Sequence, residues 1–535
     1  MRSPSFAGRA STASRLIVPF VLASLVLAAC GGGGGSPGVG ARPPSGGTTT
    51  PPVTNPTTPT TPTTPTTPSA ADLDPSTLGD AFLSYWNMCA TPRTGVDFEG
   101  KPYRDRQGTL LDELKFLRAW THQYYLWYRE VPNTYKMADF TNPIDYFAVL
   151  KTNAITPSGQ PKDKYHFTYA SDEWDKLQNA GIELGYGVTW KRNSSTAPRT
   201  WLVTLVEPGS PAAAAGLKRG DMLLRVDGVD FVNGSDAASV DRINAGLFPE
   251  VAGSAHNFTL RRGGNSYDVS MTALEVSTDP VKHVQVIDTP SGKVGYLSFE
   301  THDGVSEKEL MDAFTTFKQA AVSDLVLDMR YNGGGLLYVA SELSYMIAGP
   351  EATKGKIFER PLYNDKIPQE PAIPFLDTAY GFPAPNPARA GTPLPYLGLK
   401  RVTVLTTEGS CSASEAVING LRGADIQVDI IGSKTCGKPY GFTPVPNCGT
   451  TYFSIEFMGV NDKGFGDYAD GLAATCQVAD DLSREVGDPA EGLLAAALNY
   501  RLTGACPPAS RARMIPMEIV RPPVKEIAIR TRPRP

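Results

Sequence analysis

The sequence predicts an α/β protein whose second half forms a sheet with parallel strands. Between about residues 281 and 502, short apolar runs alternate with segments of helical spacing, and this alternation is typical of parallel strands joined by helices. The 535 residues are enough for roughly two or three domains. A formal charge of −5, from 50 Lys+Arg and 55 Asp+Glu, favours neither a nucleic acid nor a polycation as partner.

The elements of this second half follow in order along the chain. Strands are predicted at GKVGYLSFET, SDLVLDMR, KRVTVLTT, IQVDIIGS and TTYFSIEF, and helices at VSEKELMDAFTTFKQA, LLYVASELSYMIAG and SASEAVINGLRG. Ser306 and Glu309 have the spacing of a capping box at the start of the first helix. A Pro-rich insertion near residues 360–395 separates the second helix from the third strand.

The first 30 residues have the features of a secretion signal. Three arginines precede an apolar run that is too short to span a membrane comfortably. The run ends in LAAC, residues 27–30, which resembles a bacterial lipobox with Cys30 as the lipidated residue. The resemblance implies a lipid-anchored protein that faces the periplasm, and Gly31 favours the outer membrane. An ordinary cleaved signal is the alternative.

Two segments separate this signal from the later domains. Residues 31–71 are rich in Gly, Thr and Pro and are predicted to be a disordered tether, because they cannot bury a core. Residues 72–166 are predicted to be helical, with one apolar stripe made by Leu110, Leu114, Leu117, Trp120, Tyr124 and Trp127. We interpret the stripe as core; a surface that docks on the later domains is the alternative.

Residues 167–277 alternate strand-like runs with Gly turns. Two motifs stand out: PGSPAAAAGLKRGDMLLRVDG, which covers residues 208–228, and the run of Gly185, Tyr186, Gly187 and Val188. With them the segment resembles a PDZ domain of the type found in bacterial envelope proteases, in which the run at residues 185–188 matches the loop whose N–H groups bind a C-terminal carboxylate. The resemblance implies that an extended peptide binds as an added strand. A PDZ fold kept for packing or gating is the alternative.

The stretch TTEGSCSASEAVINGL, residues 406–421, places three small nucleophilic side chains between a buried strand and a helix. A nucleophile at such a turn has unpaired backbone N–H groups beside it. A Ser-rich helix cap is the alternative. A serine also needs a base; all five histidines precede Ser412, and only His302, at a strand end where polar caps are common, has a suitable context.

Lysine can replace histidine as the base if burial keeps it neutral. Lys438 lies in KTCGKPYGF, a turn with few other charges and with aromatic neighbours. The run LVLDMRYNGGG ends a buried strand with glycines, whose backbone can point N–H groups at a substrate carbonyl. A second donor is expected at the N–H of Ala413, directly after Ser412.

Three motifs in this order resemble the carboxy-terminal processing (tail-specific) serine peptidases. The family pattern SASASE matches SCSASE, residues 410–415, and places the nucleophile at Ser412. The pattern GxPTxGK matches GSKTCGK, residues 432–438, and places the base at Lys438. The pattern DLRxNxGG matches DMRYNGGG, residues 328–335, and places the oxyanion glycine at Gly334 or Gly333. The resemblance covers roughly residues 75–500.

This resemblance implies a crotonase/ClpP-like α/β core over residues 278–505, preceded in the chain by an N-terminal helical segment and a PDZ domain. Two positions depart from the family pattern. Phe442 stands where many members have a Gln that orients the lysine, so we expect Phe442 to desolvate Lys438 and Thr443 or a backbone carbonyl to orient the amine. Cys411 replaces an Ala and is interpreted as half of a disulfide or a packed thiol.

With Cys30 lipidated, an even number of cysteines remains, which indicates disulfides in an oxidising compartment. These are Cys89, Cys411, Cys436, Cys448, Cys476 and Cys506. Six cysteines allow 15 pairings, and the sequence does not choose among them. A bridge between Cys436 and Cys448, which bracket the lysine loop, is one hypothesis. Because no CxxC spacing is present and the histidines are scattered, neither a metal nor a cofactor is expected.

The resemblance implies a serine endopeptidase of the cell envelope that recognises the C-terminal tails of proteins through its PDZ domain. The expected partners are proteins or peptides with exposed C-termini and the membrane, with an adaptor lipoprotein as a candidate and no nucleic acid. Two alternatives remain: a PDZ adaptor lipoprotein with little or no catalysis, and acyl-group chemistry on small molecules. For the Pro- and Arg-rich tail, residues 506–535, an extended arm across a neighbour is the one role considered.

Overall fold

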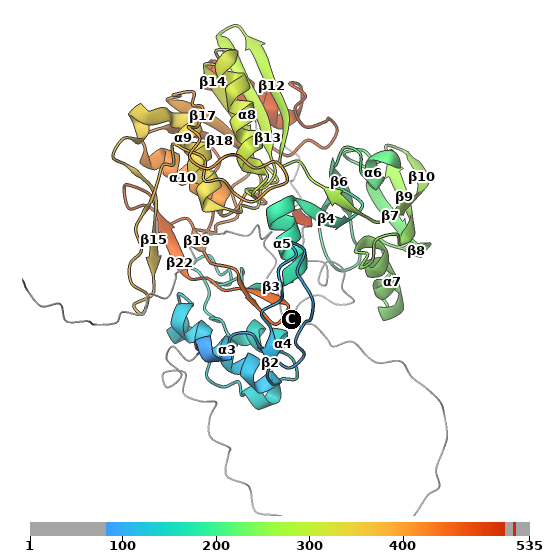
Figure 1. Ribbon diagram of the computed structural model, residues 1–535. Coiled ribbons are helices and arrows are strands. Elements are labelled where there is room, and N and C mark those ends of the chain that lie inside the picture. The colour runs from blue at the N-terminus through green and yellow to red at the C-terminus, as the bar shows by residue number, and fades with distance from the viewer. Residues whose placement is uncertain (1–81, 509–516, 521–535) are drawn as a thin grey trace, which may run out of the picture.

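The computed structural model describes residues 82–508 and 517–520. In Figure 1 these residues form a helical N-terminal part (blue), a small β-rich domain to one side (green) and a larger α/β core. The predictions made for the signal, for Cys30 and for the tether fall on residues 1–81, outside the described ranges. Among the helices of the described ranges, none is long and apolar enough to cross a membrane.

The core is built on a sheet of mostly parallel strands. The strand order is β12-β13-β14-β17-β18-β23; β12 is antiparallel to β13, and the pairs from β13 to β23 are parallel. The strands are β12 (Val281–Thr289), β13 (Gly292–Phe299), β14 (Asp324–Asp328), β17 (Arg401–Thr406), β18 (Gln427–Gly432) and β23 (Cys476–Gln477). The α/β fold class is therefore confirmed.

Helices cover both faces of this sheet. On one face, Leu325 and Leu327 share an apolar cluster with α8 (Ser306–Gln319), α9 (Leu337–Thr353) and α10 (Ala413–Gly423). On the other face, Val326 packs in a second cluster with α11 (Gly492–Thr503). Because successive strand residues point to opposite faces, β14 is buried throughout. This explains why its sequence is a continuous apolar run.

Smaller sheets extend the core toward the N-terminal part. Their strands are β15 (Ile357–Tyr363), β16 (Ile373–Pro374), β19 (Tyr440–Gly441), β20 (Val445–Asn447), β21 (Thr450–Phe453) and β22 (Phe457–Val460). β3 (Phe167–Ala170) pairs antiparallel with β21, so the chain adds a strand to the core before it enters the next domain. α5 (Ser171–Ala180) follows β3 directly.

The N-terminal part packs on the core through aromatic side chains. Leu114, Leu117 and Trp120 of α3 are buried, and Tyr452 of the core joins the same cluster. α3 ends at Tyr124, so Trp127 lies beyond the helix, where its ring meets Tyr440 at 4.9 Å. The stripe is therefore both a core and a docking surface. The elements are α2 (Phe82–Tyr85), β1 (Met88–Cys89), β2 (Arg106–Gln107), α3 (Leu110–Tyr124), η2 (Tyr128–Glu130), η3 (Met137–Asp139) and α4 (Pro143–Val149).

The β-rich domain forms a sheet of order β10-β9-β7-β6-β5-β24, with β8 on β7. Its elements are β4 (Ile182–Gly185), β5 (Val188–Arg192), β6 (Trp201–Val206), α6 (Pro211–Ala214), β7 (Met222–Val226), β8 (Val229–Asp230), α7 (Ala237–Leu247), β9 (Ala255–Arg262), β10 (Asn265–Thr272) and β11 (Leu274–Ser277). β4 pairs with β11, so the domain begins near residue 182 and not at residue 167. Its last strand, β24 (Glu518–Val520), comes from the tail.

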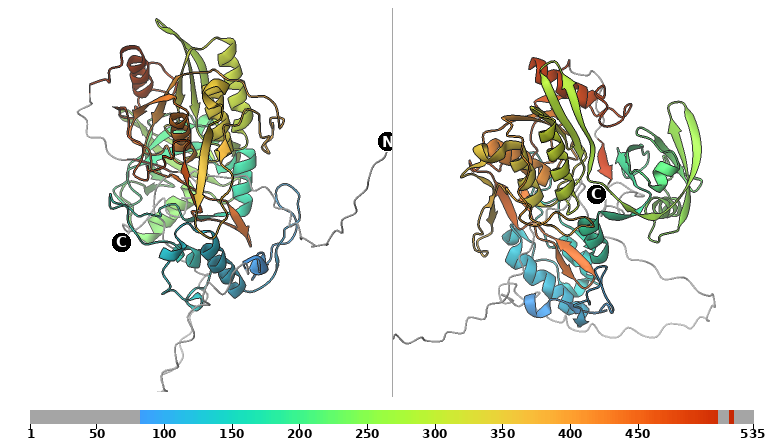
Figure 2. Two further views of the ribbon diagram at one scale, coloured as in Figure 1. Left: turned by 90° about the vertical axis from the view of Figure 1, so that its left-hand side faces the viewer. Right: turned by 45° about the horizontal axis from the view of Figure 1, so that its top comes forward.

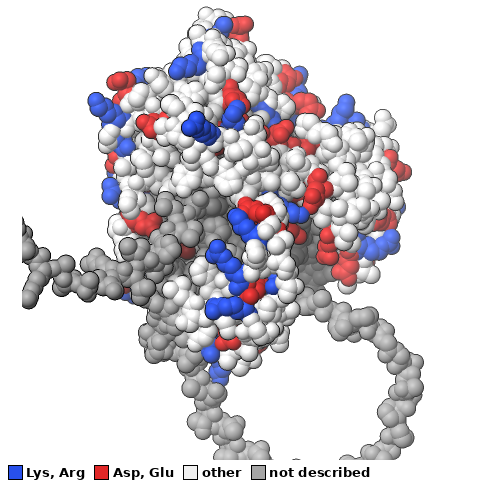
Figure 3. Space-filling model, viewed as in Figure 1, with Lys and Arg blue, Asp and Glu red and all other residues white. Residues whose placement is uncertain are grey.

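A buried group of charges joins this domain to the core. Asp480 accepts from Lys191 at 2.9 Å and from Arg219 at 2.8 Å, both in the β-rich domain, and from Arg330 of the core at 3.2 Å. Burial by itself raises the pKa of Asp480, but the three cations hold it well below its usual range. On the face shown in Figure 3, by contrast, acidic and basic side chains are interspersed.

Within residues 82–508, three disulfides cross-link the chain: Cys89–Cys448, Cys411–Cys436 and Cys476–Cys506. The hypothesis of a Cys436–Cys448 bridge is wrong. The N–H of Cys436 donates to Ser410, which places its side chain opposite Cys411. Cys448 instead lies at the turn between β20 and β21, beside β1 of the N-terminal part.

Glu359 on β15 is expected to make stability fall as pH rises. It is 4% exposed, and burial raises its pKa from 4.5 to about 8. Between these values the unfolded chain ionises while the folded chain stays protonated, so the free energy of unfolding decreases with pH. At about 1.4 kcal/mol per pKa unit, the loss is roughly 3–5 kcal/mol. Thermal unfolding of Glu359→Gln and the wild type at pH 5 and pH 9 checks this prediction. The variant should be more stable than the wild type at pH 9 and not at pH 5. An equal increase in stability at both pH values would contradict it.

Candidate active site

Ser412 occupies the turn between β17 and α10. Its backbone has φ 60° and ψ −116°, a strained conformation for a residue other than glycine. Its hydroxyl is buried and has no hydrogen-bond partner within the described residues. The neighbouring hydroxyls are engaged, since Ser410 donates to Met329 at 2.7 Å and Ser414 to Asn332 at 3.0 Å. Of the three serines in the motif, Ser412 has the hydroxyl that is available for chemistry.

Glu415 ties this turn to the loop that carries Lys438. Its carboxylate accepts from the backbone N–H of Ser412 at 3.0 Å, of Gly437 at 2.8 Å and of Lys438 at 2.8 Å. The side chain is fully buried, and burial raises its pKa against the opposing effect of these hydrogen bonds. Sequence reasoning assigned Glu415 no role. The signal was present, because Ser412 and Glu415 have the spacing of a capping box.

Lys438 is buried among aromatic rings. Its Nζ lies 4.1 Å from the ring centre of Phe442 and 5.1 Å from that of Tyr165. The Tyr165 hydroxyl donates to the carbonyl of Gly437 at 2.9 Å and so supports the loop. The ring of Phe442 thus lies against the amine, and its role in desolvating Lys438 stays a prediction. The N–H of Thr443 donates to Glu456 at 3.0 Å.

Ser412 and Lys438 lie at one site, but no hydrogen bond joins their side chains. The Ser412 hydroxyl has no hydrogen-bond partner within the described residues. Catalytic hydrogen bonds are often long without substrate and form in the substrate complex. A second lysine lies nearby: Lys164 donates to the carbonyl of Cys436 at 3.1 Å, and burial lowers its pKa. Lys164 is therefore a second candidate for the base.

The glycine loop, residues 332–335, packs directly against Ser412. Gly334 has φ +110°, and a Cβ there would lie 2.7 Å from the Cβ of Ser412, so only glycine fits. The N–H of Gly334 donates to the side chain of Asn332 at 2.9 Å. Within the described residues, the N–H groups of Gly333 and Ala413 donate no hydrogen bond. These two are therefore the donors available to an oxyanion in this conformation.

His302 supports the glycine loop. Its N–H donates to Gly334 at 2.9 Å, and its Nδ1 lies 3.1 Å from the side-chain oxygen of Asn332. Burial lowers its pKa to about 3, which keeps the imidazole neutral at ordinary pH. These contacts hold the loop in place and do not involve Ser412.

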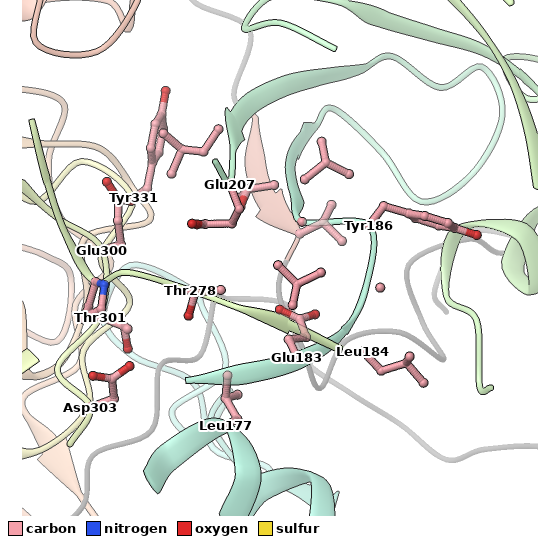
Figure 4. Close-up of a pocket in the computed structure, with 18 of the residues that line it drawn as sticks. Leu177, Glu183, Leu184, Tyr186, Glu207, Thr278, Glu300, Thr301, Asp303 and Tyr331 are labelled. Atoms are coloured by element: carbon pink, nitrogen blue, oxygen red, sulfur yellow. The ribbon is translucent and has the colours of Figure 1, made fainter. Parts of the chain in front are cut away.

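A cavity of about 210 Å³ lies between the β-rich domain and the core. In Figure 4, Glu183, Leu184 and Tyr186 line it from the β-rich domain, and Glu300, Asp303 and Tyr331 from the core. All four residues of the predicted carboxylate loop, 185–188, line it, and so does Gly335 of the glycine loop. Gly187 has φ +70°, and a Cβ there would lie 2.4 Å from Ser210.

Loss of the Cys411–Cys436 disulfide is expected to lower both stability and turnover, because the bridge joins the residue before Ser412 to the lysine loop. The bridge closes a loop of 25 residues and is expected to stabilise the folded protein by about 3 kcal/mol. We expect Cys411→Ala/Cys436→Ala to lower kcat while KM stays similar. Cys476→Ala/Cys506→Ala is a matched control, because these two cysteines are 30 residues apart in sequence and their bridge lies away from the site. Calorimetry and cleavage rates should show similar stability losses but a kcat effect in the first variant alone; equal kcat values would contradict the prediction.

Fold and site together define a PDZ-containing protein with a peptidase fold. Comparison with known families gives the same class: residues 293–453 match the Peptidase family S41 model, residues 202–245 a PDZ domain and residues 113–169 the Peptidase S41 N-terminal domain. Residues 293–453 are thus a peptidase family S41 domain, and the chain carries the PDZ and S41 N-terminal matches before it. Ser412, Lys438 and the glycine loop all lie within the peptidase match.

The curated relatives that match individually share about a quarter of their aligned residues with this chain. The chain is 24% identical over 318 residues to a "Probable CtpA-like serine protease" of Staphylococcus aureus, covering 58% of this chain and 56% of the relative. It is 25% identical over 250 residues to a "Carboxyl-terminal-processing protease" of Picosynechococcus, covering 44% and 50%. It thus spans about half the length of these curated relatives. A crystal structure assigned as an S41 protease from Bacteroides fragilis shares the fold, with a TM-score of 0.55, 24% identity and coverage of 73% of this chain and 97% of that one.

Proposed function

We propose that this protein is a serine endopeptidase in which Ser412 is the nucleophile and Lys438 the base. The observation that carries the proposal is the position of Glu415, whose single buried carboxylate holds the backbone of both residues. Such a link fixes the separation of two groups that are 26 residues apart in sequence. Preorganisation of this kind is what covalent catalysis by a weak nucleophile requires.

The mechanism follows from these positions. Neutral Lys438 accepts the proton of the Ser412 hydroxyl, and the oxygen attacks the scissile carbonyl. The N–H groups of Ala413 and Gly333 stabilise the oxyanion, and Gly334 contributes if its N–H leaves Asn332. Lys438 then donates the proton to the leaving amine, and water hydrolyses the acyl-enzyme.

The PDZ domain supplies substrate recognition in this proposal. The loop at residues 185–188 lines the cavity that reaches the glycine loop, so a C-terminal carboxylate bound there lies on the way to the site. We include in the proposal an envelope location with a lipid anchor at Cys30, and an adaptor lipoprotein as a candidate partner; both rest on the sequence.

Because the loop at residues 185–188 would bind the carboxylate of a substrate, amidation of the substrate's C-terminus should raise KM and leave kcat similar.

The test is cleavage of an unfolded protein by the full-length chain, followed by mass spectrometry of the products. Ser412→Ala should lower the rate by at least about 10³-fold. Ser266→Ala, an exposed serine on β10, is the matched control and should cleave normally. Unchanged cleavage by Ser412→Ala would assign the nucleophile elsewhere. No cleavage by the wild type, together with tight binding of C-terminal peptides, would favour a PDZ adaptor.

A further inference from the structure

The peptide-binding edge of the PDZ domain is occupied by the chain itself. β5 pairs with β6 on one side and with β24 on the other, so both of its edges are used. β24 is the short red strand beside the green domain in the right-hand view of Figure 2. A peptide that binds this domain by strand addition needs the edge of β5 that β24 covers.

The direction of β24 is the one that a bound C-terminal peptide needs. The strand is antiparallel to β5, with Glu518 opposite Arg192 and Val520 opposite Trp190. The chain therefore advances toward Val188 and the carboxylate loop at residues 185–188. Val520 lines the same cavity as that loop. β24 thus takes both the edge and the orientation that a substrate tail would use.

Each residue of β24 has a defined contact. The carboxylate of Glu518 pairs with Arg192 at 3.1 Å. Val520, 8% exposed, packs in the PDZ cluster that contains Trp190. Ile519, 5% exposed, packs instead in the core cluster that contains Tyr331. The edge therefore fits an extended segment with an acidic residue followed by two aliphatic residues.

Ile519 also reaches the loop of the nucleophile. A Cβ on Gly409 would lie 3.2 Å from the Cγ1 of Ile519, and Gly409 is three residues before Ser412. β24 therefore contacts the PDZ edge on one side and the loop before the nucleophile on the other. A peptide that replaced β24 would remove this contact.

We propose that Glu518–Val520 is a built-in competitor for the peptide-binding edge of the PDZ domain, and that substrates bind there by displacing it. This inference rests on the proposed function, in which that edge receives substrates. A strand of three residues binds weakly as a free peptide. Tethered to the same chain, it acts at an effective concentration of about millimolar, which excludes weak ligands and admits strong ones.

The experiment measures binding of a fluorescein-labelled peptide, Met-Glu-Ile-Val with a free C-terminal carboxylate, to the full-length chain. Glu518→Lys places a cation beside Arg192 and should release β24, and because Glu518 is exposed the variant should fold. Ile519→Asp should release it more completely, since the carboxylate would otherwise be buried. Glu485→Lys, an exposed charge reversal in the core, is the matched control.

Both variants should bind the peptide at least about 10-fold more tightly than the wild type and the control, because the competent fraction rises. Amide hydrogen exchange in β5 should become faster in the same variants. Unchanged or weaker binding, or no binding by any variant, would overturn the inference. The same preparations are assayed for cleavage. Tighter peptide binding without cleavage would contradict only the proposed peptidase activity. Cleavage with unchanged peptide binding would contradict only this inference.

Discussion

Replacement of Lys438 by methionine is expected to lower kcat/KM for an unfolded protein substrate by at least about 10³-fold, within the range that general base catalysis contributes. Methionine has a similar length and no charge, so it should pack against Phe442 and Tyr165 without loss of stability. The loss should therefore appear in the rate and not in the melting temperature. Steady-state kinetics and calorimetry on the same preparation separate the two.

Two further variants make this result decisive. Ser412→Ala/Lys438→Met should be no slower than either single variant, because a nucleophile and its base act as one unit. Lys164→Met, which removes the half-buried lysine at Cys436, should retain activity within a few-fold. If Lys164→Met is inactive and Lys438→Met is active, the base has been assigned to the wrong lysine.

Glu415→Ala is expected to cause the largest loss of stability. It leaves the N–H groups of Ser412, Gly437 and Lys438 buried without an acceptor. Each such group costs about 1–3 kcal/mol, so the sum is a large part of the stability of an ordinary domain. Urea unfolding measures the loss directly.

Glu415→Gln distinguishes a positioning role from a purely structural one. The amide keeps one acceptor oxygen, which can still serve the N–H groups of Ser412 and Lys438, so the loss of stability should be smaller than in Glu415→Ala, while the geometry between Ser412 and Lys438 loosens. We expect kcat to fall about 10-fold or more with KM similar, since binding does not use this residue. Glu408→Gln, an exposed carboxylate in the same loop, is the control. A Glu415→Gln variant with normal kcat would contradict the positioning role.

Identical spacing in two helices shows where local sequence reasoning stops. Ser306 and Glu309 have capping-box spacing, and α8 does begin at Ser306, but its N–H donates to Asp303 at 2.9 Å and Glu309 accepts instead from Val281 at 3.0 Å. The predicted capping box there is wrong. Glu415, with the same spacing, does reach back to Ser412. The spacing predicts a helix start, and the tertiary neighbours decide which partner each carboxylate takes.

By itself, the sequence determined the α/β core, the PDZ and N-terminal domains and the resemblance to a peptidase family, because these depend on periodicity and on motifs that lie within one segment. Tertiary structure alone decided what depends on segments far apart. The partner of Cys89 is 359 residues away, and β24 lies more than 300 residues after β5. The link from Ser412 through Glu415 to Lys438 also exists only once α10 and the lysine loop meet. Local patterns record burial and propensity, whereas such contacts arise when distant segments pack together.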